Sequence, residues 1–256
     1  MRIQLVLLLG LYVFAPGVAR SEPPKHKTSI VLVHGAWTDG SSWDKVVPLL
    51  EAKGFDVIAV HLPLTTTSDD IATTERAIER ATGDVVLVGH AYGGFVITAA
   101  GNAPKVKALV YVDAYALDDG ETINGVLGAK RPAWTQALQL DAGGFAWLSA
   151  DLIANDFAPD LTLAQQHVLA AKQAPVSLRL FDDPMRGAAW KLKASWYVQG
   201  NDDRIIPPAV QARMARRIKA KLIEVDAGHV SMLSKPRAIA EVIIEAAATE
   251  VQTASQ

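Results

Sequence analysis

Two things are scarce in this chain: it contains no cysteine among its 256 residues, and its formal net charge is only −2. Without cysteine no disulfide framework can form. No long run of like charge is present, so the electrostatic footprint of a nucleic-acid-binding protein is missing. We therefore expect no nucleic-acid partner, and a neutral or apolar small molecule is the favoured ligand.

What the chain does have is apolar residues, which make up 50% of the sequence. A chain of this length and composition can bury a large core, and single α/β domains often reach this size. One domain of the size of an enzyme is therefore the default interpretation. The histidines and acidic residues show no cluster with ligand spacing, so no metal is indicated. No cofactor is expected either, and the oligomeric state stays open.

Residues 1–21 have the pattern of a secretory leader, in which Arg2 precedes an apolar run and small residues follow up to Ala19. The run is shorter than the ~20 apolar residues that span a bilayer. Gly10 and Pro16 also interrupt it. We therefore expect export to the periplasm or the medium, with no stable membrane insertion after the leader is removed.

Residues 22–256 alternate between short apolar runs and longer segments of helical period. Nearly continuous hydrophobic strands separated by helices are typical of a parallel sheet that helices cover on both faces. The fold class is therefore α/β. The predicted strands begin at residues 28, 56, 84, 106, 194 and 221, and the predicted helices span 41–54, 68–83, the segment after residue 91, 207–218 and 236 to about 249.

The alternation fails from about residue 116 to residue 190, where helical period continues without strand runs. This stretch is predicted to be a helical cap inserted between two strands of one sheet. It can then roof the carboxyl ends of the strands, where ligands bind in open α/β sheets.

Three loops at the carboxyl ends of predicted strands carry the chemistry: G-H-A-Y-G-G at 89–94, G-N-D-D-R-I-I-P at 200–207 and A-G-H at 227–229. With serine at position 91, the first would be a G-x-S-x-G nucleophile elbow, a strained turn that lifts a hydroxyl above the sheet. Here Ala91 offers only a methyl group. The covalent ester mechanism is therefore closed to the chain as written.

As an ordered set, these motifs resemble the α/β-hydrolase superfamily, in its small-esterase and hydroxynitrile-lyase branch, close to methyl-salicylate-type esterases. V-L-V-H-G-A-W, the elbow, the G-x-x-D-x-x-x-P loop and the late G-H carry the resemblance over roughly residues 28–247. It implies an α/β-hydrolase fold in which Ala91 occupies the nucleophile position. It also implies that Asp203 orients His229 and that His229 acts first as general base and then as general acid.

The resemblance further implies an oxyanion hole made by the backbone N–H groups of Ala36 and Tyr92. The lyase relatives have a lysine after the catalytic histidine and a threonine at the position of Gly35, whereas this chain has Val230 and glycine. Both departures favour the esterase side. The residues assigned to a substrate pocket are Gly35, Trp37, Trp134, Trp147 and Val230.

Other polar residues near these motifs are assigned structural roles. His34 and His90 flank functional backbone, so packing is favoured over proton transfer for both. Asp113, at the end of its strand, is assigned to loop stabilisation, ahead of substrate orientation or service as an alternative acid.

Ala91 leaves three interpretations. The chain is an otherwise intact hydrolase with a Ser→Ala change, or an enzyme that uses the Asp203–His229 dyad on water or on a substrate proton, as a hydrolase, lyase or cofactor-free oxygenase. The third is a ligand-binding protein that has lost the reaction. The complete set of remaining parts favours an enzyme scaffold over a binding protein. The hypothesis is an esterase-like hydrolase whose parent reaction is hydrolysis of a small carboxylic ester through a serine at position 91.

Overall fold

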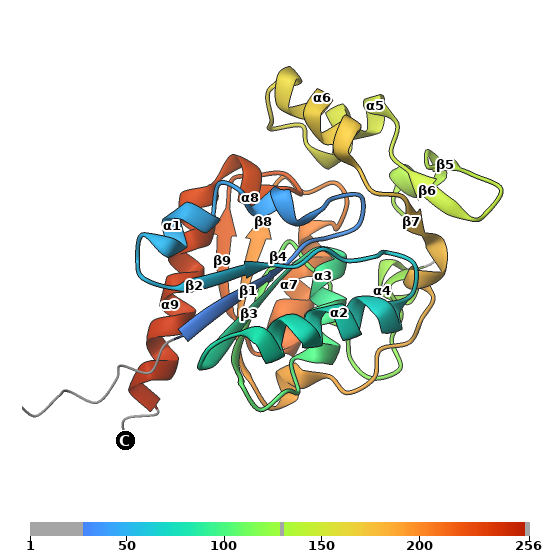
Figure 1. The fold of residues 1–256 in the computed structure, drawn as a ribbon. Helices are drawn as coiled ribbons and strands as arrows, with labels where there is room; N and C mark the ends of the chain where they lie inside the picture. The colour runs from blue at the N-terminus through green and yellow to red at the C-terminus, as the bar shows by residue number, and fades with distance from the viewer. Residues whose placement is uncertain (1–27, 129–130, 254–256) are drawn as a thin grey trace, which may run out of the picture.

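The computed structural model describes residues 28–128 and 131–253, so the leader predicted for residues 1–21 lies outside the described residues. Its centre is a six-stranded sheet in the order β2-β1-β3-β4-β8-β9, in which every neighbouring pair is parallel (Figure 1). The predicted α/β fold is therefore confirmed. The strands are β1 (Thr28–Val33), β2 (Asp56–Ala59), β3 (Asp84–His90), β4 (Val106–Val112), β8 (Ala194–Gly200) and β9 (Lys221–Val225).

The burial of the strands explains their sequence pattern. β3 and β4 lie in the middle of the sheet and are almost wholly buried. Because both faces of these strands are covered, they read as continuous apolar runs. β9 lies at an edge and is exposed or partly exposed along its length.

Helices cover the two faces of the sheet. α9 packs on β3, β4 and β8 together with α1, while α3 packs on β3 and against α2, and α7 packs on β8. Figure 1 shows α1 and α9 on one side of the sheet and α2, α3 and α7 on the other. Their bounds are α1 (Val47–Glu51), α2 (Thr67–Arg80), α3 (Tyr92–Ala100), α7 (Pro208–Arg217), α8 (Ser231–Ser234) and α9 (Pro236–Thr253).

The single helix predicted over residues 41–54 was wrong in its extent. The structure has a 3₁₀ helix, η1 (Gly40–Trp43), followed by the short helix α1. Pro48 stands in the first turn of α1. Proline has no backbone N–H and is tolerated where a helix begins, so it starts a second helix instead of extending the first.

The stretch between β4 and β8 differs in part from its prediction. It contains α4 (Ile123–Leu127), α5 (Ala150–Leu152), the π-helical turn η3 (Ile153–Phe157) and α6 (Leu163–Lys172). It also forms an antiparallel sheet of β5 (Gln139–Leu140), β6 (Phe145–Trp147) and β7 (Val176–Ser177). The expectation of no strands was therefore wrong. Runs of two or three residues are too short to show an alternating pattern. The remaining elements are the 3₁₀ helices η2 (Ala133–Gln136), η4 (Leu178–Phe181) and η5 (Ala189–Lys191).

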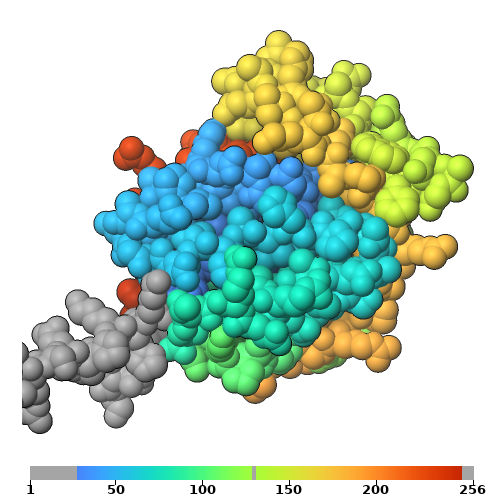
Figure 2. Space-filling model, in the orientation of Figure 1, coloured from blue at the N-terminus to red at the C-terminus, as the bar shows by residue number. Residues whose placement is uncertain are grey.

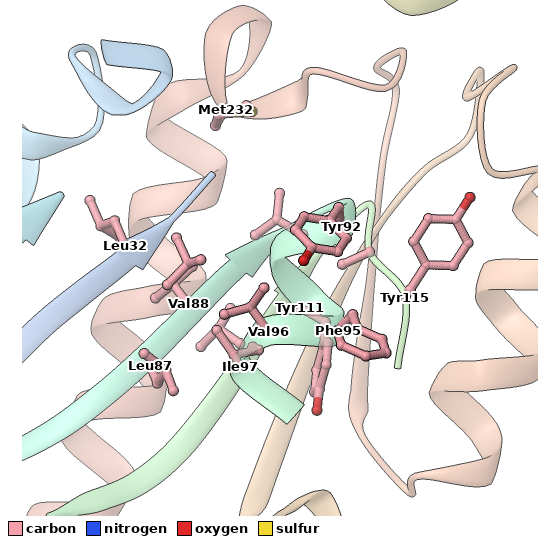
Figure 3. Close-up of a cluster of buried hydrophobic side chains, with 14 of the residues drawn as sticks. Leu32, Leu87, Val88, Tyr92, Phe95, Val96, Ile97, Tyr111, Tyr115 and Met232 are labelled. Carbon is pink, nitrogen blue, oxygen red and sulfur yellow. The ribbon is translucent and has the colours of Figure 1, made fainter. Parts of the chain in front are cut away.

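We call residues 139–177, from β5 to β7, the cap. In Figure 1 the cap lies beyond the end of the parallel sheet, whereas α4 lies beside the helices of the body. The first turns of α3 belong to the buried core of the sheet, and Figure 3 shows Val96 of α3 beside Val88 of β3. Within the described residues, no helix combines the length and apolar character needed to span a bilayer.

Candidate active site

Ala91 alone makes the turn between β3 and α3. Its backbone has φ 48° and ψ −116°. Such a conformation in a residue with a Cβ costs on the order of 1–3 kcal/mol. Three backbone hydrogen bonds hold it: its N–H donates to the carbonyl of Val112 (3.2 Å), and its carbonyl accepts from the N–H groups of Gly94 (3.0 Å) and Tyr115 (3.1 Å). The strained turn is therefore fixed by the end of β4 and by its own helix.

The glycines around the turn are required by close packing. A Cβ on Gly89 would lie 2.5 Å from the carbonyl oxygen of Gly93, and one on Gly93 would lie 2.6 Å from that of Val33. A Cβ on Gly35 would lie 2.8 Å from both the Ala91 methyl and His90 Nδ1. The loop after β1 is thus pressed against position 91.

Asp203 and His229 form a buried pair. Asp203 Oδ2 lies 2.9 Å from His229 Nδ1, and the two side chains are 0% and 2% exposed. Asp203 also accepts hydrogen bonds from the N–H groups of Ile205 (2.8 Å) and Ile206 (3.0 Å) and from Gln211 Nε2 (2.7 Å). These donors fix the carboxylate, so the imidazole that it holds can take only one orientation.

The electrostatics of this pair favour a neutral imidazole. Burial lowers the pKa of His229 to about 3, so the ring is uncharged at neutral pH. Burial also raises the pKa of Asp203, and the donors from Ile206, Ile205 and Gln211 oppose that rise by stabilising the carboxylate. With the Nδ1 proton directed at Asp203, the lone pair of His229 lies on Nε2. This is the state of the ring that accepts a proton.

The proposed oxyanion donors flank position 91. Tyr92 follows Ala91 directly, and Ala36 follows Gly35, which touches the Ala91 methyl. Neither backbone N–H has a hydrogen-bond partner within residues 28–128 and 131–253. The Tyr92 side chain is anchored away from the turn, because its hydroxyl donates to Asp70 Oδ2 (2.7 Å). Both N–H groups are therefore available to an oxyanion.

His34 and His90 make structural contacts. The N–H of Leu62 donates to His34 Nε2 (2.9 Å), so the proton of His34 lies on Nδ1, which donates to the carbonyl of Gly35 (2.9 Å). His90 Nε2 donates to the carbonyl of His229 (2.8 Å). Burial lowers the pKa of both rings, that of His34 to about 4. Each histidine thus holds a loop of the site while remaining neutral.

Asp113 joins three chain segments at the same end of the sheet. Its Oδ1 accepts from the N–H of Gly200 (2.7 Å) and its Oδ2 accepts from Ser231 Oγ (2.5 Å). The side chain is fully buried, and its backbone φ is 46°. Burial, with the nearby charge of Asp203, raises the pKa of Asp113 well above its usual range. The carboxyl ties the end of β4 to the Asp203 loop and to the His229 loop.

An aromatic cluster connects the reaction centre to the cap, to which Phe157 belongs. The Trp37 ring makes edge contacts with Trp134, Phe157 and Phe181 at centroid distances of 5.8, 6.4 and 5.8 Å. Phe157 in turn meets the His229 ring at 5.2 Å. Hydrogen bonds place two of these rings: Trp37 Nε1 donates to the carbonyl of Ala146 (3.0 Å), and Trp134 Nε1 donates to that of Ile205 (3.0 Å).

Trp147, assigned to the pocket from the sequence, is not part of this cluster. It is half-buried on β6 opposite Gln139 and makes no ring contact within the part of the chain that the structure describes. Side chains alternate along a strand, and Ala146, its neighbour, is the buried residue of β6. Val230 is fully buried between His229 and α8, and Gly35 adjoins Ala91.

The comparisons with known proteins agree with this architecture. Residues 30–242 match the model of the alpha/beta hydrolase family. The chain belongs to this family. The hydrolase is 30% identical to a pyrethroid hydrolase of Sphingobium wenxiniae, over 85% of this chain and 87% of the relative. It is 27% identical to methylesterase 3 of Arabidopsis thaliana, over 87% of this chain and 97% of the relative.

Solved structures show the same fold. The crystal structure of a pyrethroid hydrolase from Sphingobium faniae aligns with this hydrolase at a TM-score of 0.75 and 26% identity. The alignment covers 86% of this chain and 97% of the other. The resemblance to the esterase-like branch of the superfamily is therefore confirmed.

Several residues of the hydrolase site were missed by the sequence interpretation. Phe157, Phe181 and Gln211 come from segments without a recognisable motif. Asp160 was missed as well; its Oδ2 accepts from the N–H of Gly228, beside His229, at 3.0 Å. The contacts of Phe157, Phe181 and Asp160 span long sequence separations, so only the fold brings these residues to the site, whereas Gln211 lies eight positions from Asp203. Among the described residues, no group of three or more histidine, aspartate or glutamate side chains is placed to hold a metal ion.

Proposed function

We propose that this α/β hydrolase is a scaffold for hydrolysis of small, uncharged carboxylic esters by a Ser-His-Asp mechanism, in which alanine occupies the nucleophile position. The chain with Ala91 then binds esters and polarises their carbonyl without forming an acyl-enzyme. Its relatives include named hydrolases and esterases, which supports this reaction class. The aromatic cluster of Trp37, Trp134, Phe157 and Phe181 supports an ester with an apolar portion.

The observation that carries the proposal is the backbone of Ala91. A methyl side chain makes no interaction that would explain a strained turn at φ 48° and ψ −116°. The same turn would lift a hydroxyl on its Cβ beyond the end of β3, next to the loop of Gly35 and Ala36. Backbone strain of this kind is found mainly at functional sites, which supports a reacting group at this position.

With serine at position 91, the proposed reaction has two halves, acylation of the serine and hydrolysis of the acyl-enzyme. Serine Oγ attacks the ester carbonyl carbon while His229 Nε2 takes the hydroxyl proton, and the N–H groups of Ala36 and Tyr92 stabilise the oxyanion. The tetrahedral intermediate collapses, the C–O bond breaks, and His229 returns the proton to the leaving alcohol. Water, activated by His229, then hydrolyses the acyl-enzyme to the acid. Asp203 stabilises the imidazolium in both halves.

The test is steady-state turnover of p-nitrophenyl acetate and butyrate by three proteins: the chain as it stands, Ala91→Ser, and Ala91→Ser with His229→Ala. We expect serine to raise kcat at least about 10³-fold and the histidine change to remove that gain. If serine leaves turnover unchanged in a folded protein, position 91 is not a nucleophile position for these esters.

A second candidate function is supported by the Asp203–His229 pair itself, which is complete without a group on residue 91. The dyad can deprotonate water or a substrate. In that case the Ala91 chain has turnover of its own, His229→Ala abolishes it, and Ala91→Ser brings no gain. Adding His229→Ala with Ala91 retained to the three proteins above therefore separates the two candidates.

A further inference from the structure

A cavity of about 330 Å³ lies between α6 of the cap and the body of the hydrolase. It is distinct from the reaction centre, because neither Ala91, Asp203 nor His229 lines it. Its volume is at the lower end of those that hold drug-sized molecules. In Figure 2 the yellow atoms of the α6 region lie directly above the blue atoms of the segment that follows β1.

The apolar wall of the cavity comes from both sides of this junction. Trp37 and Leu233 line it from the body, and Leu161, Val168 and Leu169 line it from the cap. These side chains are the kind that bury an apolar ligand. Trp37 forms the inner wall and is 2% exposed, and Leu161 beside the cavity is 8% exposed.

α6 is only partly packed: it contacts α5 and η3, and Leu169 and Ala170 are half-buried against the core. None of its ten residues is buried, and Leu163 and Val168 are 66% and 55% exposed. The helix is held at its start by a capping box, in which Thr162 and Gln165 bond reciprocally. Since helices in proteins are stabilised mainly by burying an apolar face, an apolar molecule beneath α6 would complete the burial of a face that is now only half-buried.

The polar groups at the rim give the cavity no net charge. Two are acidic, Asp39 and Asp44, and two are basic, Lys45 and Lys172. Both ammonium groups are engaged: Lys45 Nζ donates to the carbonyl of Leu233 (2.8 Å), and Lys172 Nζ donates to Ser41 Oγ (3.0 Å). The Asp39 carboxylate accepts from the N–H of Ser41 (2.7 Å). A charged ligand would have to displace these bonds, so an uncharged ligand is favoured.

We propose that the cavity between α6 and the segment after β1 is a binding site for an uncharged, largely apolar small molecule. Its inner wall is Trp37, and the residue before Trp37 is Ala36, whose N–H is a proposed oxyanion donor. A molecule in the cavity therefore contacts the same loop that borders position 91. The site itself is argued from the cavity and its lining and does not depend on the proposed function.

The test is an equilibrium titration of the unmodified chain with N-phenyl-1-naphthylamine, an uncharged probe whose fluorescence rises in apolar sites. Three proteins are compared: the chain, Leu169→Trp, which fills the cavity from α6, and Leu163→Trp, the same change at an exposed position of α6 outside the lining. We expect saturable binding, weakened at least tenfold by Leu169→Trp and unchanged by Leu163→Trp. No binding to the chain, or equal loss in both variants, would overturn the proposal.

Leu169→Asn is a second variant, which makes part of the wall polar without adding volume. It should also weaken binding of the probe. Circular dichroism of each variant checks that the fold is retained. If a folded Leu169→Asn and a folded Leu169→Trp both bind the probe as the parent does, the binding site lies elsewhere.

The molecule in the cavity has two conceivable sources, a long ester substrate or a separate ligand. In the Ala91→Ser background, Leu169→Trp would raise KM for p-nitrophenyl decanoate but not for the acetate if the cavity holds the ester chain. It would leave both KM values unchanged if the ligand is separate. Absence of turnover in that background would count against the proposed function. The probe titration would still show whether the cavity is a binding site.

Discussion

The carboxyl end of the sheet and the cap are built in opposite ways. At the sheet end, Asp113, Asp203 and His229 are at most 3% exposed, and hydrogen bonds join the three loops in which they lie. In the cap, α6 buries none of its residues. Polar groups held in a dry, fixed site can be pre-organised for chemistry, whereas a thinly packed element can adjust to ligands of different shape. The difference suggests that reaction type resides in the sheet and selectivity in the cap.

The largest effect should come from the acid of the pair. In the Ala91→Ser background, Asp203→Asn is expected to lower kcat about 10³- to 10⁴-fold, because the amide no longer holds His229 in the proton-accepting tautomer. KM for p-nitrophenyl acetate should change little, since Asp203 does not face the ester. A loss of less than tenfold, or a larger loss in Asp113→Asn, would move the role of the acid to Asp113.

The second prediction concerns the proton of Asp113. If this carboxyl is protonated at neutral pH, Asp113→Asn keeps the shape of the side chain and its amide oxygen still accepts from the N–H of Gly200, while its amide nitrogen donates to Ser231 Oγ in place of the bond that Oδ2 accepts. It should then change the free energy of unfolding by less than about 1 kcal/mol. Asp113→Ala leaves two buried donors without a partner and should cost about 3 kcal/mol. Chemical denaturation at pH 7 measures both, and equal costs would show that the carboxyl is needed in its charged form.

Stability at the sheet end should also depend on pH through His34. Burial lowers the pKa of His34 from its ordinary value of 6.5 to about 4 in the folded chain. The unfolded chain therefore binds the proton more readily, so the stabilisation is complete above pH 6.5 and is lost as pH falls towards 4. A depression of this size corresponds to about 3 kcal/mol. Denaturation curves from pH 7 to pH 4.5 should show a smaller loss in His34→Gln, which cannot titrate. Parallel loss in both proteins would assign the pH effect to other groups.

The same contrast explains what the sequence could predict. β1, β3, β4 and β8 were recognisable because burial on both faces makes a continuous apolar run. The pairing of Asp203 with His229 followed from motif order, and the structure joins the two at 2.9 Å, while their catalytic roles stay predictions.

The strands of the cap could not be predicted, because they are too short to show a local pattern and are stabilised by pairing with each other. Trp147 is an example: its residue type suggested a pocket residue, but on β6 the buried side chain is that of Ala146, and Trp147 is only half-buried. The bond between Asp113 and Ser231 spans 118 positions and no motif marks it. Contacts of this kind depend on topology, so they become visible only when the strands are in place.

The smallest expected effect is at the start of α6, and it tests whether the cap is energetically separate from the sheet. Thr162→Ala removes the capping box and should cost α6 about 1 kcal/mol. Because α6 contributes no buried residue, this loss should appear as faster amide hydrogen exchange within 163–172, with little change in the midpoint of global unfolding. An equal decrease in protection along β3 and β4 would mean that the cap unfolds together with the sheet. Selectivity could then not vary in the cap without a cost to the stability of the reaction centre.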